Sequence, residues 1–419
     1  MNIYKINNNK FKTVYFSYNF TLPVKKEDIS YYSVLSSVLA KTNKVYKSQK
    51  EISEYLYSLY GASFDINIEK IGDLFNLEFR IEFVNDKFLD GDSNVLESAL
   101  KFLYTMIYNP VFVDGNIDNT LVEREKQSIL EKILTRKDDK LKYSVNRTEE
   151  LLCRDEPFGT FLYGEEDVVK GITSGDLEKY YNKMINDALI SVIISGNLDG
   201  YDNLENMTKE IFGKSANSVN KNSEFLTNVH DSINDNKCEE IKEKADTVQS
   251  VITYGLRVKD FNINEFFILN VYNAVLGATP SSKLFQNFRE KESLAYTVRS
   301  RYYRYKDFII IYAGINSKNY EKAKEVLNKE LKDMQLGNIS DEEFKAAKES
   351  LVSDLLEVAD SKVGLAKMFM SNLFFFEDDS IDINYMIDQI KKVTKDQVIN
   401  IAKRVELNMI YFLGGEISE

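Results

Sequence analysis

The stretch GITSGDLEKYYNKMINDALISVIISGNLDG, residues 171–200, has a counterpart in KVTKDQVINIAKRVELNMIYFLGGEISE, residues 392–419. In each stretch an Ile-Thr or Val-Thr pair precedes a helical segment, and a β-branched strand then ends at glycine. Two such endings at a spacing of about 220 residues predict that the chain is duplicated. Each half is then expected to contain the same fold.

The remaining segments of the two halves follow the same order. The first half predicts a strand, two helices, a hairpin and two further helices, at residues 12–22, 28–40, 51–59, 64–83, 96–107 and 117–140. The second half predicts a strand, two helices, two strands and two helices, at residues 248–258, 263–277, 281–290, 295–315, 319–334 and 341–358. Ser48 with Glu51, and Ser340 with Glu343, form capping boxes that begin one helix in each half.

The sequence therefore predicts an α+β protein of two homologous halves, each with an antiparallel-rich sheet and helices packed on one face. We expect an N-terminal domain at 1–213 and a C-terminal domain at 247–419. The polar segment 214–246, rich in Asn, Ser, Lys and Glu, is expected to be the linker between them. His230, the only histidine of the chain, lies in this linker and is expected to be a solvated side chain.

Composition excludes several classes of function. The 419 residues carry a net charge of −12, which argues against a nucleic-acid partner because phosphate binding needs clustered Lys and Arg. The same charge favours a basic or amphipathic ligand, if there is a charged ligand at all. No apolar run approaches the ~20 residues that span a bilayer, so we expect no membrane contact. The N-terminus lacks the apolar stretch of a signal peptide, and Cys153 and Cys238 lie far apart, so a cytoplasmic location is predicted.

Four stretches carry a resemblance to a known family. They are SLYGASFDINIEKIGDLFNLEFRIEF at 58–83, VEREKQSILEKI at 122–133, GITSGDLEKYY at 171–181 and FREKESLAYTVRS at 288–300. With these stretches the chain resembles the insulinase-like zinc metallopeptidases, the pitrilysin or M16 family, over nearly its whole length. The resemblance implies the duplicated LuxS-metallohydrolase-like fold, with the two halves closing as a clamshell.

Active members of that family carry an HxxEH motif in the helix before LYGA, with a downstream Glu as the third zinc ligand. Here that helix reads YYSVLSSVLAKTNKVY, so the motif positions fall on Ser33, Ser36 and Ser37, and Glu123 matches the third ligand. The first half contains no histidine, and serine hydroxyls are poor zinc ligands. We therefore expect no metal, no cofactor and no hydrolysis by this chain alone. The serines are expected to be small helix-face residues, because no histidine could activate one as a nucleophile, and Glu123 is expected to form a surface ion pair.

The family also carries an Arg and, seven residues later, a Tyr that hold the substrate backbone opposite the zinc. Arg289 and Tyr296 match that pair. A guanidinium offers a fixed fork of donors, and a phenol can donate to a developing oxyanion. The alternative is a surface arginine that happens to precede a strand-start tyrosine. Arg299, Arg301 and Arg304 alternate with tyrosines; they could extend a groove, but an exposed cationic strand face is the favoured interpretation.

The resemblance implies a catalytically inactive, substrate-binding subunit of a heterodimeric M16-type zinc peptidase. Its partners would be a homologous HxxEH-bearing subunit, which alone holds zinc, and a peptide substrate. It also resembles the inactive bacterial partner associated with elongation factor P 5-aminopentanol modification, and other such pairs are associated with bacteriocin maturation. Two alternatives stay open: a structural scaffold without a role in proteolysis, and a self-sufficient metallopeptidase with unusual ligands.

Overall fold

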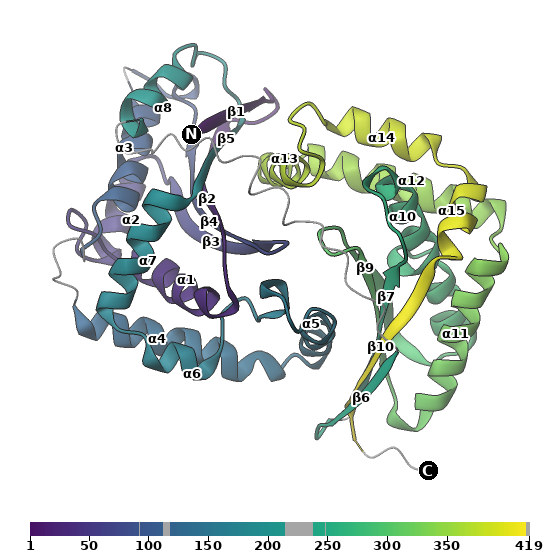
Figure 1. The fold of residues 1–419 in the computed structure, drawn as a ribbon. Coiled ribbons are helices and arrows are strands. Elements are labelled where there is room, and N and C mark those ends of the chain that lie inside the picture. The colour runs from purple at the N-terminus through teal and green to yellow at the C-terminus, as the bar shows by residue number, and fades with distance from the viewer. Residues whose placement is uncertain (92, 112–117, 214–237, 248, 416–419) are drawn as a thin grey trace. The chain divides into compact units, whose positions relative to one another are not determined.

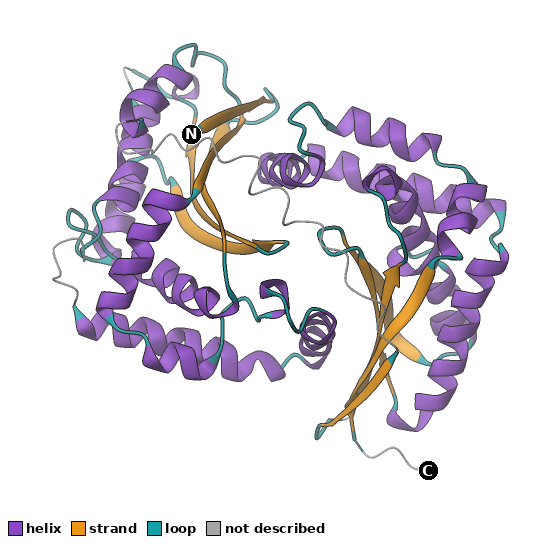
Figure 2. Cartoon of the chain, viewed as in Figure 1, coloured by secondary structure: helices purple, strands orange, loops and turns teal. Residues whose placement is uncertain are grey.

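The chain forms two compact units in the computed structural model, each built around a five-stranded sheet and a layer of helices (Figures 1 and 2). The described residues are 1–91, 93–111, 118–213, 238–247 and 249–415. Each unit mixes strands and helices around its own buried core, so the predicted α+β class is confirmed.

The first sheet has the strand order β1-β5-β2-β4-β3. Its strands are β1 (Asn2–Asn7), β2 (Thr13–Pro23), β3 (Ser63–Ile71), β4 (Leu74–Val84) and β5 (Leu189–Gly196). β1 lies parallel to β5, and the other neighbours are antiparallel. The predicted hairpin is β3–β4, which turns through Gly72 at a φ of +58°, a backbone region in which glycine is the least strained residue.

The second sheet repeats this arrangement as β6-β10-β7-β9-β8. Its strands are β6 (Glu239–Lys244), β7 (Ser250–Val258), β8 (Ala295–Tyr303), β9 (Phe308–Ile315) and β10 (Val405–Gly414). β6 lies parallel to β10, as β1 lies parallel to β5, and the other neighbours are again antiparallel. The shared order confirms the predicted duplication.

Helices cover one face of each sheet, as predicted. In the first unit they are α1 (Lys26–Leu39), α2 (Gln49–Ser58), α3 (Val95–Tyr108), α4 (Asn119–Leu134), α6 (Glu166–Gly171), α7 (Ser174–Asp187) and α8 (Leu204–Phe212). In the second they are α10 (Phe266–Asn273), α11 (Tyr320–Leu336), α12 (Asp341–Ala359), α14 (Ile383–Lys392) and α15 (Lys395–Ala402). The long helix predicted at 117–140 is wrong at its end, because α4 stops at Leu134.

Local signals place several helix ends correctly. The Ser48 side chain accepts a hydrogen bond from the Glu51 amide at 3.2 Å, and that of Ser340 accepts one from the Glu343 amide at 3.0 Å, as the capping boxes predict. Thr173 and Thr394 cap α7 and α15 in the two repeat endings. The endings that revealed the duplication thus share their cap as well as their strand.

β4 shows how the first sheet separates an apolar face from a polar one. Its alternate residues facing the helices are fully buried and apolar: Phe75, Leu77, Phe79, Ile81 and Phe83. The residues between them, on the second face, are Asn76, Glu78, Arg80 and Glu82. This period of two confirms the predicted hairpin with one apolar face, and it leaves a polar face to be covered by another element.

Each sheet receives one more helix on its second face. In the first unit this helix is α13 (Lys362–Phe376), whose Lys362 Nζ lies 2.8 Å from Glu82 Oε1 and whose Phe369 ring lies 4.9 Å from that of Tyr4. In the second unit it is α5 (Lys140–Leu152), whose Thr148 hydroxyl lies 2.5 Å from that of Thr253 on β7. α5 and α13 occupy the same place in the repeat, so each half of the sequence contributes this helix to the other unit.

The compact units consequently differ from the predicted sequence domains. Among the described residues, the first unit consists of those within 1–135, 156–213 and 360–374, whereas the prediction was 1–213. The predicted linker, 214–246, is also wrong at its end, because β6 pairs with β10 there. The rest of that linker, His230 included, lies outside the described residues. The segments 136–155 and 360–374 change unit because their apolar faces pack on the other sheet.

The contact between α5 and β7 is close enough to test. A Cβ atom at Gly255 would lie 2.8 Å from Leu152 Cδ1, which is shorter than any ordinary contact. We expect Gly255→Val to destabilise the protein by roughly 1–3 kcal/mol through overpacking. Leu152→Ala should restore part of that loss, which a double-mutant cycle of thermal unfolding would measure. Strictly additive losses would mean that α5 does not pack on this strand.

Candidate functional site

The degenerate zinc-motif helix uses its first two serines for internal hydrogen bonds. Ser33 is fully buried, and its hydroxyl donates to the carbonyl of Leu162 at 2.8 Å. Ser36 is also buried and donates to the carbonyl of Ser33 at 2.8 Å, a bond within α1. Both hydroxyls therefore satisfy backbone acceptors inside the first unit, as expected of small residues on a packed helix.

The third serine meets a carboxylate, but not the one predicted. Ser37 donates to Glu125 Oε2 at 2.6 Å, and Glu125 is only 3% exposed. Glu123 instead has a largely exposed side chain, and its Oε1 lies 2.9 Å from the Nζ of Lys126, the surface ion pair that the sequence suggested. Glu123 therefore forms the ion pair that was expected of it, and the carboxylate that contacts Ser37 is Glu125.

The helical period could have identified Glu125. The buried apolar residues of α4 include Leu121, Val122 and Ile129, and Glu125 falls on the same stripe at positions i+4, i+3 and i−4 from them. Glu123 lies off that stripe. A carboxylate on the buried stripe of a helix needs a partner, and Ser37 with Arg124, whose Nε donates to Oε1 at 3.1 Å, supplies two.

The donor set around α1 does not fit zinc. A catalytic zinc site needs three protein ligands, drawn from His, Cys, Asp and Glu. Three hydroxyls and a single carboxylate do not supply that set, and two of the hydroxyls already donate to carbonyl groups. Across the described ranges, no group of three or more His, Cys, Asp or Glu side chains is placed to hold a metal ion.

The second unit brings Arg289 and Tyr296 together through a tight main-chain turn. Arg289 lies in the π-helical segment η6 (Leu284–Lys291), and Tyr296 lies at the start of β8. Three consecutive backbone amides, at residues 292, 293 and 294, donate to the carbonyls of residues 287, 289 and 288 at 3.0–3.1 Å. Ser293 turns the chain at a φ of +51°, an unusual value for a residue other than glycine. These bonds fix the positions of Arg289 and Tyr296, which are seven residues apart in the sequence, relative to each other.

The two side chains stack and are open to solvent. The Arg289 guanidinium lies 5.3 Å from the centroid of the Tyr296 ring and 4.6 Å from that of Phe285. Tyr296 is 80% exposed, because a register irregularity between Ala295 and Thr297 turns it out of the β8–β9 ladder. The pair is therefore displayed at the sheet edge with its polar groups accessible.

A shallow hollow of about 240 Å³ opens beside Tyr296. Its lining residues come from the ends of β8 and β9 and from the segment before β7: Gln249, Ser293, Leu294, Ala295, Tyr296, Gly314, Ile315 and Asn316. A Cβ atom at Gly314 would lie 2.5 Å from Gln249 Nε2, so the glycine leaves room for the end of that flexible side chain. The hollow thus gives the phenol an adjacent concave surface on which a ligand chain could lie.

A buried carboxylate supports this turn from the core side of the second unit, and the sequence-based predictions did not include it. Glu330 of α11 is 1% exposed, and its Oε2 accepts a hydrogen bond from Asn287 Nδ2 at 2.8 Å. Its Oε1 has no hydrogen-bond partner, and burial raises the pKa of Glu330. The stripe of Ala323, Leu327, Glu330 and Met334 marks it as inward-facing at helical spacing, which is the signal that could have identified it.

The arginines of β8 divide into two groups. Arg299 and Arg301 are exposed and alternate along the strand, which agrees with the favoured cationic face. Arg304 does not belong to that face. Its guanidinium lies 4.8 Å from the ring of Phe266 and 5.4 Å from that of Phe375, within the aromatic packing of the second unit. Arg304 follows the end of β8, so the alternation no longer applies to it.

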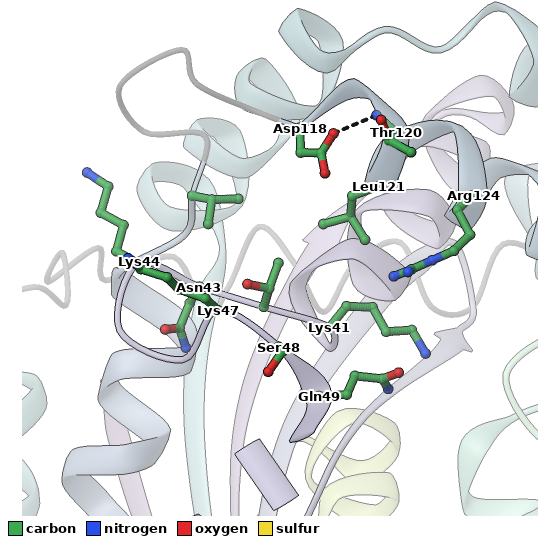
Figure 3. A pocket seen from close by; sticks show the side chains of 12 residues that line it. Lys41, Asn43, Lys44, Lys47, Ser48, Gln49, Asp118, Thr120, Leu121 and Arg124 are labelled. Atoms are coloured by element: carbon green, nitrogen blue, oxygen red, sulfur yellow. Dashed lines mark hydrogen bonds between the residues drawn. The ribbon is translucent and has the colours of Figure 1, made fainter. Parts of the chain in front are cut away.

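A separate, basic hollow of about 860 Å³ lies in the first unit, between the segment after α1 and the start of α4 (Figure 3). Its polar lining includes Lys41, Lys44, Lys47 and Arg124, with Asp118 as an acidic member. Asp118 Oδ1 accepts a hydrogen bond from the Thr120 amide at 2.9 Å and so caps α4. Neither the degenerate motif residues nor the Arg289–Tyr296 pair lines this hollow.

Comparisons with known proteins agree with this geometry. Residues 171–351 match the family model described as "Peptidase M16 inactive domain". The protein named "Probable inactive metalloprotease YmfF" from Bacillus subtilis (strain 168) is 27% identical over 413 residues, which cover 97% of this chain and 94% of that protein. The chain is similar to the M16 metallopeptidases over nearly its whole length.

Other M16 relatives and solved structures extend the likeness. "Uncharacterized zinc protease YmxG", also from Bacillus subtilis (strain 168), is 23% identical over 86% of this chain and 81% of its own length. A conserved protein from Enterococcus faecalis V583 superposes with a TM-score of 0.86 at 26% identity, covering 100% of this chain and 97% of that one. A peptidase M16 inactive domain from Pseudomonas fluorescens has the same fold, with a TM-score of 0.78 at 14% identity and coverage of 100% and 96%.

The matched model is described as an inactive domain and YmfF is named as a probable inactive metalloprotease, which agrees with the serines found at the zinc-motif positions. These relatives carry no elongation factor P name, so that pathway stays a prediction. In the part of the chain that the structure describes, every helix is too short or too polar to cross a bilayer.

The buried Glu330, which supports the turn that carries Arg289, makes the stability of the protein depend on pH. Because its pKa is raised in the folded protein, the folded chain keeps the proton at pH values where the unfolded chain has lost it. The free energy of unfolding therefore falls as the pH rises through that window. Glu330→Gln, which has no proton to lose, should stabilise the protein by roughly 1 kcal/mol at pH 8 and much less at pH 4.

Thermal unfolding between pH 4 and pH 8 would measure this difference. Glu325→Gln is the matched control, because Glu325 lies on the same helix with a side chain that is 72% exposed. An equal effect of Glu330→Gln at both ends of the pH range would contradict a raised pKa for the buried carboxyl.

Proposed function

We propose that this chain is the non-catalytic, substrate-holding subunit of a two-subunit M16 zinc peptidase. The observation that carries the proposal is the contrast between the two units. In the first, serines whose hydroxyls are already bonded stand at the positions of the zinc motif. In the second, a half-exposed Arg289 stacks on the exposed ring of Tyr296, and main-chain hydrogen bonds hold the turn that connects them.

The chemistry of the pair suits the role. The guanidinium keeps its charge at every physiological pH and offers several donors in a rigid plane, so it can hold a peptide carbonyl without titrating. The exposed phenol can donate to an oxyanion that develops when a partner's metal-bound water attacks that carbonyl. Neither group performs the cleavage, so the zinc and the general base must come from the partner.

The partner we propose is a homologous M16 subunit that carries HxxEH. One bacterial strain, Bacillus subtilis (strain 168), contains both a relative named as an inactive metalloprotease and one named as a zinc protease. A peptidase that is divided between two subunits requires one chain of each kind in the same cell. We place the pair in the cytoplasm, since two cysteines that lie far apart in the sequence, outside any CxxC motif, are typical of a reducing compartment.

The test begins with a pull-down from the native cell, followed by identification of a co-purified HxxEH homologue. The reconstituted pair is then assayed on unfolded peptides. Arg289→Ala and Tyr296→Phe should each lower kcat/KM of the mixture by about 10²-fold, the usual cost of losing one oxyanion donor. Zinc analysis should find the metal in the partner alone.

Tyr57→Phe and Lys332→Ala serve as controls, because they remove a phenol hydroxyl and a positive charge from exposed positions on α2 and α11. Unchanged turnover with both Arg289→Ala and Tyr296→Phe would refute the holding role. A stable complex that cleaves no peptide would instead favour the scaffold alternative.

A further inference from the structure

β8 is the last strand of the second sheet, so one edge of its backbone is not paired within that sheet. Free strand edges are a liability that proteins usually cover, and they are also the surfaces to which extended peptides add as a further strand. Tyr296 lies at the start of this strand, beside the hollow of about 240 Å³. A polypeptide held by the Arg289–Tyr296 pair therefore has an open strand edge on which to continue.

The side chains along this edge carry unneutralised positive charge. Arg299 and Arg301 are both exposed and lie on the same face of β8, two residues apart. Arg301 lies 5.0 Å from the Tyr303 ring, but within the described residues neither arginine has a carboxylate within 4.0 Å. Several other arginines of this acidic chain do have a carboxylate within that distance: Arg80, Arg124, Arg136, Arg147, Arg154, Arg289 and Arg404.

The chain has a net charge of −12, so carboxylates are plentiful. That Arg299 and Arg301 have none within 4.0 Å among the described residues indicates that their counter-charge comes from another molecule. Glu149 of α5 is close enough to contribute to the raised pKa of Tyr303, whose ring lies next to Arg301. Guanidinium groups at alternate strand positions face one side of a sheet, as do residues i and i+2 of a neighbouring strand. The geometry matches a ligand strand with carboxylates two residues apart.

We propose that β8 binds an extended, acidic polypeptide segment whose carboxylates at alternate positions meet Arg299 and Arg301. This inference rests on the proposed holding function and narrows its substrate class. It also reverses the expectation of a basic ligand drawn from net charge. Charges beyond about 8 Å are screened at physiological salt, so the two local arginines outweigh the distant acidic surface.

The experiment measures binding of two fluorescent, unstructured peptides to the full chain at physiological salt. The peptides have equal length and differ only in Glu or Gln at alternate positions. The wild-type protein should bind the Glu peptide roughly fivefold more tightly, as expected of two exposed ion pairs. The variant R299E/R301E should lose this preference or reverse it, while the Gln peptide binds as before.

K332E/K345E is the matched control, since it makes the same change of charge at exposed positions of α11 and α12 in the same unit. This variant should keep the preference. A wild-type protein without preference, a preference that survives R299E/R301E, or an equal loss in K332E/K345E would each overturn the inference.

The failure of this inference and that of the holding function are distinguishable. If R289A and Y296F weaken both peptides alike and neither peptide is preferred, the holding function stands and the acidic specificity falls. If neither peptide binds the wild-type protein at all, the holding function falls and the inference falls with it. Thermal unfolding of each variant verifies that it is folded.

Discussion

The three amide-to-carbonyl bonds that link η6 to the start of β8 are the constraint on which the rest of the site depends. They force the chain through a left-handed turn at Ser293, and so place the Arg289 guanidinium over the Tyr296 ring. Such a turn is strained by itself, and it persists only because the surroundings determine it. Asn287 and the buried Glu330 supply that support from the core side.

In the first unit, the serines at the zinc-motif positions of α1 are already hydrogen-bonded within the protein. Where an active family member would place metal donors, α1 has hydroxyls that bond to carbonyls and to the buried Glu125. A buried carboxylate without a partner is costly, and Ser37 and Arg124 keep Glu125 satisfied. The zinc-motif helix is thus part of a hydrogen-bonded scaffold, while the stacked Arg289–Tyr296 pair lies in the second unit.

Much of the fold was readable from local signals. The capping boxes, the repeat endings and the period-two pattern of β4 all point to the same elements, and they agree with the observed sheets. The strands β1 and β6 were missed because their sequences, NIYKIN and EEIKEK, mix polar and apolar residues on a sheet edge. α5 was missed because its buried face carries Tyr143, Ser144 and Thr148 beside its few aliphatic residues.

The duplication, the resemblance to the M16 peptidases, the absence of histidine from the first half and the presence of Arg289 and Tyr296 can all be read from the amino-acid sequence. Repeat spacing and residue identity are properties of the chain alone. The tertiary structure was needed to show that Glu125 contacts Ser37, that Glu330 supports the turn, and that Arg304 packs among aromatic rings while Arg299 and Arg301 are exposed. These facts depend on which face of a helix or strand meets a neighbour from a distant part of the chain, which short-range patterns do not specify.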